Sequence, residues 1–241
     1  LRGSAEADLG FLSAALSNAS GAVRCAAVEA LTDLGGARAA EAVAFASTDE
    51  EPEVCRAAVA ALGRMRSEHG TAVGLPRLVE LVERSTDPEL LEFAIRALSE
   101  THAPEAAEVL RPLLRSSQPL LAVCAVEALA ELSVESAADA LLDGLQHAEP
   151  EVVKAAMQAL SERPSPQAIA RIGACLEHEA WDVRRLAADL LGRVSGDIAL
   201  GLLRARLARE DSPTVQAAIG RALERIAGIR RTPPPGSFRQ R

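Results

Sequence analysis

Two histidines occupy equivalent places in the sequence, His147 and His178, and Cys175 lies three residues before the second of them. Imidazole and thiolate groups are the usual ligands of zinc, and residues three apart lie on one face of a helix. A zinc site needs three or four converging ligands, however, and no further Cys or His is expected nearby. Attraction of an imidazole to the negative end of a helix dipole explains both histidines. The sequence therefore predicts neither a bound metal nor another cofactor.

Motifs for other kinds of chemistry are missing from the sequence. It contains no glycine-rich phosphate loop, no GxSxG elbow and no Ser/His/Asp arrangement. Its four cysteines form no CxxC pair and lie mostly in apolar stretches, as expected of reduced thiols in a cytoplasmic protein. No apolar run reaches the roughly 18 residues that span a bilayer, and no segment has the layout of a signal peptide. We therefore expect a cytoplasmic protein that is not an enzyme and does not enter a membrane.

The charge of the chain is unevenly distributed. The formal net charge is −8, but residues 221–241 hold six arginines and one acid, which leaves −13 on residues 1–220. Proteins that bind nucleic acid neutralise phosphates with a basic surface. The acidic body of this chain argues against a nucleic-acid partner.

A pattern recurs along the whole chain, most clearly at residues 52–63, which read PEVCRAAVAALG. Each copy contains an aliphatic anchor residue, and a leucine follows every anchor eight residues later. Successive anchors are 31, 36, 31, 31, 31 and 32 residues apart, a period that indicates an array of stacked helical repeats. The anchors are Val23, Val54, Leu90, Leu121, Val152, Val183 and Val215.

Each copy has the features of an α-helix, which we call the second helix of its repeat. A proline stands two residues before the anchor in most copies, where its missing N–H costs a helix nothing. Apolar residues follow the anchor after three, four, seven, eight and eleven positions, which form one helical face. The fifth position is also apolar, so the helix is expected to be packed on two sides. A first helix precedes each second helix, at residues 5–17, 37–47, 75–84, 104–115, 136–147, 166–178 and 196–209.

These patterns predict two regions. Residues 1–229 form an all-α solenoid of about seven helix pairs, and residues 230–241, which are rich in Arg and Pro, form a disordered tail. One interval between anchors, from Val54 to Leu90, is 36 residues long instead of 31 or 32. The extra residues lie within 64–76, where glycines and a proline interrupt the helical pattern. These extra residues form either a functional loop or a tolerated surface insertion.

The second helices resemble the short HEAT-like repeats that are named after phycobilin lyase subunits and occur in many bacterial scaffold proteins. The likeness is best at residues 53–63 (EVCRAAVAALG) and 182–192 (DVRRLAADLLG), and it covers about residues 5–228. It implies a right-handed superhelix whose concave face is lined by the second helices. It says little of function, because packing residues define the family. The pair His178-Glu179 also resembles the His-Glu pairs of deoxyhypusine hydroxylases, but that di-iron chemistry needs several such pairs and this chain has one.

A polar stripe is expected on the second helices at two, six and ten positions after each anchor. If these helices line a concave face, the stripe is acidic in its middle and basic at its C-terminal end, and we predict that it binds a protein partner with a basic central element. The alternative is a solvated face stabilised by i,i+4 ion pairs such as Arg96–Glu100. The predicted binding residues are Glu29, Asp33, Arg64, Arg96, Glu100, Glu127, Glu131, Gln158, Glu162, Trp181, Asp189 and Arg193.

Trp181 is the only tryptophan in a chain without tyrosine, and it replaces the proline that most copies have at this position. It is either an anchor for a partner or a residue that packs against Leu186. Taken together, the sequence predicts a non-enzymatic scaffold or adaptor that binds a protein. The alternative is a phycobilin-lyase-like subunit that handles a tetrapyrrole, although the scarcity of aromatic residues counts against it.

Overall fold

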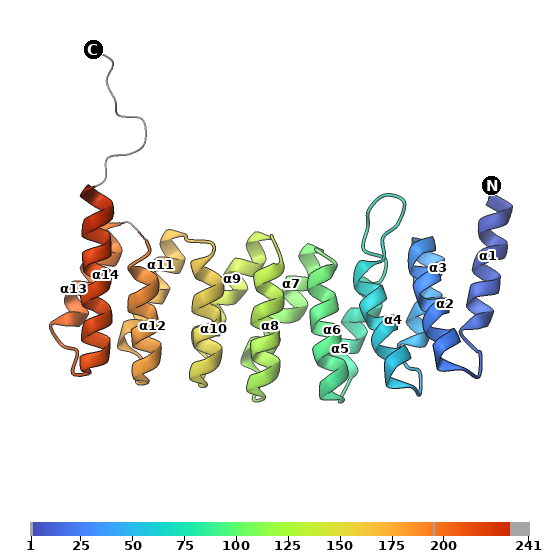
Figure 1. Ribbon diagram of the computed structural model, residues 1–241, viewed down its shortest axis with the longest axis horizontal. Helices are drawn as coiled ribbons and strands as arrows, with labels where there is room; N and C mark the ends of the chain where they lie inside the picture. Colours follow the sequence, from blue (N-terminus) through green and yellow to red (C-terminus); the bar gives the residue numbers. More distant parts are fainter. Residues whose placement is uncertain (1, 195, 232–241) are drawn as a thin grey trace, which may run out of the picture. The chain divides into compact units, whose positions relative to one another are not determined.

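The structure, a computed structural model, describes residues 2–194 and 196–231 (Figure 1). Within these residues it contains fourteen α-helices, two short 3-10 helices and no β-structure except one isolated bridge between Arg66 and Ala72. The all-α fold that the repeat predicts is confirmed. None of the described helices is both long enough and apolar enough to cross a membrane.

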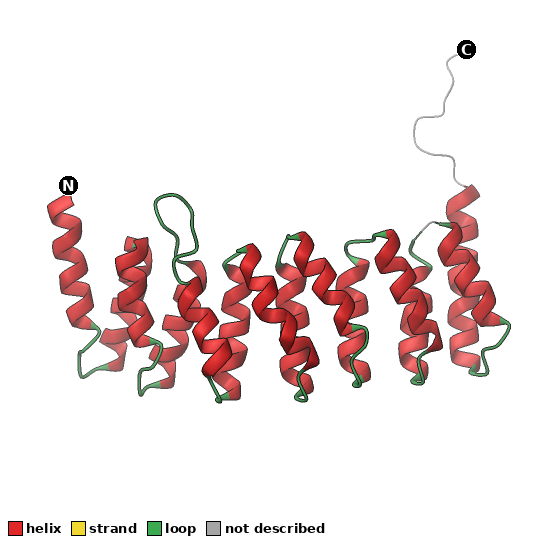
Figure 2. Cartoon of the chain, turned by 180° about the vertical axis from the view of Figure 1, so that it is seen from behind, coloured by secondary structure: helices red, strands yellow, loops and turns green. Residues whose placement is uncertain are grey.

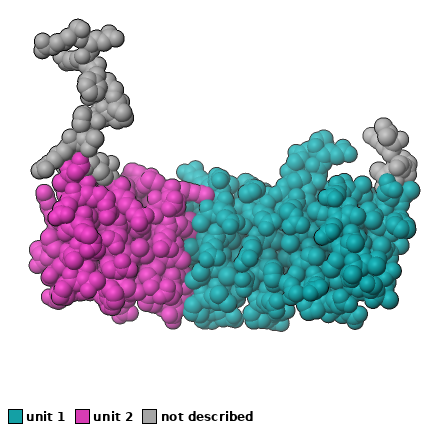
Figure 3. All heavy atoms as spheres, viewed as in Figure 1, with its two compact units in different colours: residues 1–140 teal, residues 141–241 magenta. Residues whose placement is uncertain are grey.

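The chain divides into two compact units, unit 1 (residues 1–140) and unit 2 (residues 141–241), which Figure 3 shows in different colours. Unit 1 contains α1 (Arg2–Ala15), α2 (Gly21–Leu34), α3 (Gly36–Ala46), α4 (Pro52–Arg64), α5 (Leu75–Arg84), α6 (Pro88–Glu100), α7 (Pro104–Leu110), η1 (Arg111–Arg115) and α8 (Pro119–Glu131). The boundary falls within α9 (Glu135–Gly144). Unit 2 continues with α10 (Pro150–Ser161), α11 (Pro166–Ala174), η2 (Cys175–Glu177), α12 (Trp181–Leu191), α13 (Asp197–Leu207) and α14 (Pro213–Arg231).

Within each unit the second helices stack on one another and the first helices cover them. In unit 1, α4 packs against α2 and α6, and α6 packs against α8, while α3 and α5 lie against α4 and α6 (Figure 1). In unit 2, α12 packs between α10 and α14, and α11 and α13 lie against α12 and α14. This arrangement explains the wide apolar arc, because each second helix contacts its own first helix and the helices of neighbouring pairs.

The core positions of the second helices follow the predicted face. In α4 the anchor Val54 and the residues five and eight positions later, Val59 and Leu62, are fully buried. Gly63 follows at the ninth position, where a Cβ atom would lie only 2.6 Å from the backbone oxygen of Ala97. A small residue at this position therefore sets how closely α4 and α6 approach.

Several first helices differ from the prediction at their ends. The helix expected at residues 104–115 changes to a 3-10 helix at Arg111, because Pro112 has no N–H to continue the α-helical bonds. The helix expected at residues 166–178 likewise tightens into a 3-10 turn at Cys175. The last helix, α14, extends to Arg231, two residues beyond the predicted end of the array. The predicted disordered tail otherwise lies outside the described residues.

The extra residues of the long interval form a loop between α4 and α5, visible above the helices in Figure 2. The two sides of the loop pair at Arg66 and Ala72, and Gly70 turns the chain with a φ of 80°. The backbone oxygen of Arg66 accepts a hydrogen bond from the Gly36 amide at 3.1 Å. Its guanidinium donates to the backbone oxygen of Glu100 at 2.6 Å. The base of the loop is therefore bonded to α3 and to α6.

Two arginines with little exposed surface join successive helix pairs in the same way, one in each unit. The Arg24 guanidinium donates two hydrogen bonds to the Asp49 carboxylate, at 2.7 and 2.8 Å. The Arg184 guanidinium donates two to Glu210, both at 3.0 Å, and Arg206 adds another at 2.8 Å. Arg24 and Arg184 each directly follow an anchor and also donate to two backbone oxygens just before their own helix. These bidentate ion pairs fix the loop that joins the two helices of the following pair, α3 to α4 in unit 1 and α13 to α14 in unit 2.

Candidate docking surface on the second helices

The predicted stripe is accessible on the second helices of both units. Every one of its twelve residues is exposed or half-buried. In unit 1 the residues come from α2, α4, α6 and α8, which stack in that order. Helical periodicity alone therefore located a set of accessible polar side chains.

A small hollow between α6 and α8 brings three of the predicted residues together. Arg96, Glu127 and Glu131 line a cavity of about 40 Å³. The Ser99 hydroxyl at its edge donates a hydrogen bond to the Glu131 carboxylate, which holds that side chain in place. Two of the predicted carboxylates and one predicted guanidinium thus meet at the junction of two helices.

The predicted ion pair between Arg96 and Glu100 does not form. Arg96 pairs instead with Glu92, one turn earlier in α6, at 3.2 Å. Glu100 lies 4.0 Å from the Arg64 guanidinium on the neighbouring helix α4. The correction has a physical reason, because Glu100 ends its helix beside the end of α4 and a cation on that helix is within reach.

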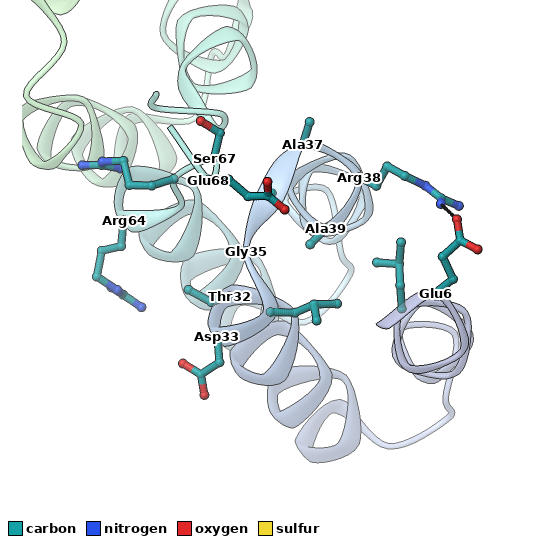
Figure 4. Close-up of a pocket in the computed structure, with 14 residues that line it drawn as sticks. Glu6, Thr32, Asp33, Gly35, Ala37, Arg38, Ala39, Arg64, Ser67 and Glu68 are labelled. Atoms are coloured by element: carbon teal, nitrogen blue, oxygen red, sulfur yellow. Dashed lines mark hydrogen bonds and ion pairs between the residues drawn. The ribbon is translucent and has the colours of Figure 1, made fainter. Parts of the chain in front are cut away.

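A larger cavity of about 640 Å³ lies at the other end of unit 1, among α1, the end of α2, the start of α3 and the long loop (Figure 4). The predicted residues Asp33 and Arg64 line it. Across the cavity Arg38 of α3 pairs with Glu6 of α1 at 3.3 Å. Acidic and basic groups balance around this cavity, so its charge favours no single class of ligand.

In unit 2 the stripe is interrupted by local contacts. Glu162 and Arg193 line one hollow of about 330 Å³ beside the ends of α10 and α12. The Asp189 carboxylate forms an ion pair with the Arg185 guanidinium at 3.4 Å. Gln158 is exposed on α10.

Trp181 begins α12 with about half of its surface, 52%, exposed. A large aromatic side chain that is half accessible at a helix start is suited to contact a partner.

The histidines and Cys175 have structural roles. The Nδ1 atom of His147 accepts a hydrogen bond from the Glu149 amide at 2.9 Å, and His178 accepts one from Ala180 at 3.0 Å. These bonds hold the short loops that follow the two histidines. Burial raises the pKa of the Cys175 thiol to about 11. Among residues 2–194 and 196–231, no group of three His, Cys, Asp or Glu side chains is arranged to hold a metal ion.

Three residues with polar or thiol side chains in the hollow between α6 and α8 were missed. Glu92, Ser99 and Cys124 line it together with the predicted residues. Glu92 stands two positions after its anchor and belongs to the stripe pattern, so the helical period was sufficient to find it. Ser99 and Cys124 lie outside that pattern and enter the hollow only because α6 and α8 pack side by side.

Comparisons with known proteins agree with this architecture. The profile of HEAT repeats matches residues 9–83, 75–161 and 138–224. No curated protein matches the sequence. Among solved structures, the YibA protein of Escherichia coli is similar, with a TM-score of 0.51 and 13% identity over 93% of this chain and 96% of that chain.

Two further solved structures are similar at lower TM-scores. The complex of CpcE and CpcF of phycocyanin lyase from Nostoc sp. PCC7120 has a TM-score of 0.48 and 20% identity, over 90% of this chain and 94% of that chain. Human deoxyhypusine hydroxylase in complex with glycerol has a TM-score of 0.44 and 20% identity, over 93% and 97%. Similarity at such identities concerns the fold and not the function. Because the three matches of the repeat profile together run from residue 9 to residue 224, the chain belongs to the family of HEAT-repeat proteins.

Proposed function

We propose that this protein is a non-enzymatic scaffold that binds a protein partner through the polar stripe of its second helices. The observation that carries the proposal is the junction of α6 and α8, where Glu127 and Glu131 are exposed beside a hollow. The partner would present a basic segment to these carboxylates. Its binding would weaken with rising salt, because exposed charges are screened.

The free cysteines support a location in the cytoplasm. Cys25, Cys55, Cys124 and Cys175 all carry free thiols. Proteins in reducing compartments keep their thiols unpaired.

A charge-reversal experiment tests the stripe. The full chain and a variant carrying Glu100→Arg, Glu127→Arg and Glu131→Arg are used to capture proteins from a native lysate. The protein captured by the wild type is identified and purified, and its Kd is measured against both forms. We expect the variant to bind at least about tenfold more weakly, since like charges face each other across the interface.

A matched control separates the stripe from net charge. The variant with Glu83→Arg, Glu105→Arg and Glu108→Arg makes the same change of charge on exposed positions of the first helices α5 and α7. It should bind the purified partner as the wild type does. Equal affinity of all three forms would show that the stripe is not the binding surface.

A further inference from the structure

The N-terminal end of unit 1 exposes apolar positions that most other repeats bury. The anchor of the first copy, Val23, is 40% exposed, whereas the anchor of the next copy, Val54, is fully buried. Eleven positions after the anchor, Leu34 is 38% exposed, whereas Met65 is 1% exposed. Val54 lies in α4, which packs against α2 of the preceding pair, and Met65 directly follows α4. On α2 the same row of apolar side chains has no such cover within the described residues.

The C-terminal end of unit 2 exposes the opposite face of a repeat. Leu207 of α13 is 37% exposed, whereas Leu176, which lies 31 residues earlier, is 2% exposed because the last pair covers it. Small residues contribute part of the accessible surface of these last two helices, beside exposed charged residues such as Arg204 and Glu224. The accessible small residues include Gly201 and Ala205 on α13, Ala208 directly after it, and Ala217, Gly220 and Ala227 on α14.

The charges beside the two end faces are opposite in sign and equivalent in position. Six and ten residues after the anchor, α2 carries Glu29 and Asp33, and α14 carries Arg221 and Arg225. All four side chains are accessible. Glu29, Asp33 and Arg221 form no ion pair with any other described residue.

Neighbouring second helices within unit 1 already pair charges in this row. Arg64 and Glu100 both stand ten positions after their anchors, and they lie 4.0 Å apart across the contact of α4 with α6. If α14 of one molecule packed on α2 of another as α4 packs on α6, Arg225 would face Asp33 in the same way, and Arg221 would face Glu29.

We propose that the α1–α2 end face binds the α13–α14 end face of a second copy of this chain, so that the molecules associate head to tail. The contact repeats the stacking of α4 on α6, with Val23 and Leu34 covered by the small residues of α14. Such a heterologous contact leaves one face of each kind free and permits further addition of molecules. An end-to-end pairing of two α2 helices is less suitable, because it would bring the acidic groups of both copies together.

One residue opposes the contact. Glu224 stands nine positions after its anchor, where most other second helices carry glycine, alanine or serine. At that position Gly63 and Gly192 approach the next helix closely. The association is therefore expected to be weak, and Glu224→Ala should strengthen it by replacing a long charged side chain with a small one at the position of closest approach.

Sedimentation velocity of the full chain, at low salt and over a hundredfold range of concentration upwards from low micromolar, tests the proposal. The wild type should sediment faster as concentration rises, and Val23→Asp should abolish the change. Because Val23 is accessible, that variant should keep its fold, which circular dichroism checks. Phe45→Asp is the matched control, since Phe45 is 75% exposed on α3 in the second pair, and it should associate like the wild type.

Charge reversal gives a second, independent test. One variant carries Glu29→Arg with Asp33→Arg, and the other carries Arg221→Glu with Arg225→Glu. Each alone should associate at least about tenfold more weakly than the wild type, and an equimolar mixture should regain the wild-type behaviour because both contacts are then complementary.

The possible results separate clearly. A wild type that stays monomeric at every concentration overturns the proposal. So does association that survives Val23→Asp, or a mixture of the two charge variants that stays monomeric. Val23 is not part of the partner-binding stripe, so the proposal and the function proposed above can fail independently.

Discussion

At the scale of single residues, the strongest interactions outside the apolar core are the buried ion pairs between helix pairs. Glu210 has a fully buried side chain and accepts hydrogen bonds from Arg184 and Arg206. Burial disfavours its charge, but the bonds from Arg184, the Ser212 amide and Arg206 outweigh this and lower the pKa of Glu210 to about 2. Removing one member of such a group leaves buried charges without a partner.

We therefore expect Glu210→Ala to lower the free energy of unfolding of unit 2 by about 3 kcal/mol at pH 7. The pKa of a glutamate in an unfolded chain is about 4.3, so the folded value is the lower one. The stabilisation is complete above about pH 5 and is lost as the pH falls toward about 2. The difference between wild type and variant should shrink over that range. Denaturant unfolding, followed by the fluorescence of Trp181, measures it.

The neighbouring residue provides the control. Asp211 is exposed, and Asp211→Ala should change the free energy of unfolding by less than about 0.5 kcal/mol at any pH. An effect of Glu210→Ala that stays constant from pH 7 to pH 3 would contradict the role given to its ionised form.

The sequence allowed some of these residues to be predicted and not others. The stripe residues follow from the helical period within one helix, and all are accessible. The contacts of Ser99 with Glu131 and of Arg64 with Glu100 join residues more than thirty positions apart. They depend on the register between neighbouring helices, which no local pattern specifies.

At the scale of helices, the separation of neighbouring second helices is set by single positions. A Cβ atom on Gly192, at the end of α12, would lie 2.6 Å from the Cβ atom of Ala222 in α14. That distance is far below van der Waals contact, so the two helices would have to move apart. Gly201, on α13, has open space around the same position.

Substitution by alanine should therefore change the stability of unit 2 in opposite directions at the two glycines. Gly192→Ala is expected to destabilise unit 2 by about 1–3 kcal/mol. Gly201→Ala is expected to stabilise it by up to about 1 kcal/mol, because alanine favours a helix interior. Thermal unfolding of dilute protein compares them. A Gly192→Ala variant as stable as the wild type would mean that the helices are not in closest contact at Gly192.

Helix ends were the least predictable part of the fold. Proline marked the start of α4, α6, α8, α10 and α14 correctly, because its position in the first turn has a local cause. The change to a 3-10 helix at Cys175 has no proline near it, and the one glycine, Gly173, lies two residues earlier within α11. It depends on how α11 and η2 pack against α12, which is a tertiary effect.

At the scale of the whole molecule, stability is expected to be local. In a repeat array each helix pair contacts only its neighbours, and the chain divides into two compact units. Unfolding of one unit should therefore leave helices of the other in place. Trp181 reports on unit 2 alone, whereas circular dichroism reports on all helices.

This difference gives a test with paired substitutions. Leu62→Asp places a charge at a fully buried position of unit 1, and Leu191→Asp does so at a position of unit 2 that is 1% exposed. With Leu62→Asp, part of the circular dichroism signal of the helices should be lost at a lower denaturant concentration than in the wild type. The midpoint of the transition that Trp181 fluorescence reports should stay almost unchanged. Leu191→Asp should lower that midpoint. Equal shifts of the Trp181 midpoint in both variants would show that the chain unfolds as one cooperative body.

The long loop between α4 and α5 has a consequence for engineering. Its base is fixed by the bonds of Arg66 to Gly36 and Glu100, whereas its tip at Glu68 and His69 is exposed. A peptide tag or a small domain inserted at the tip would disturb only the turn, and the bonds at the base would remain. The same insertion directly before Arg66 would separate the loop from both helices. The chain therefore offers, in its longest repeat, a place where new sequence can be carried without changing how the helices stack.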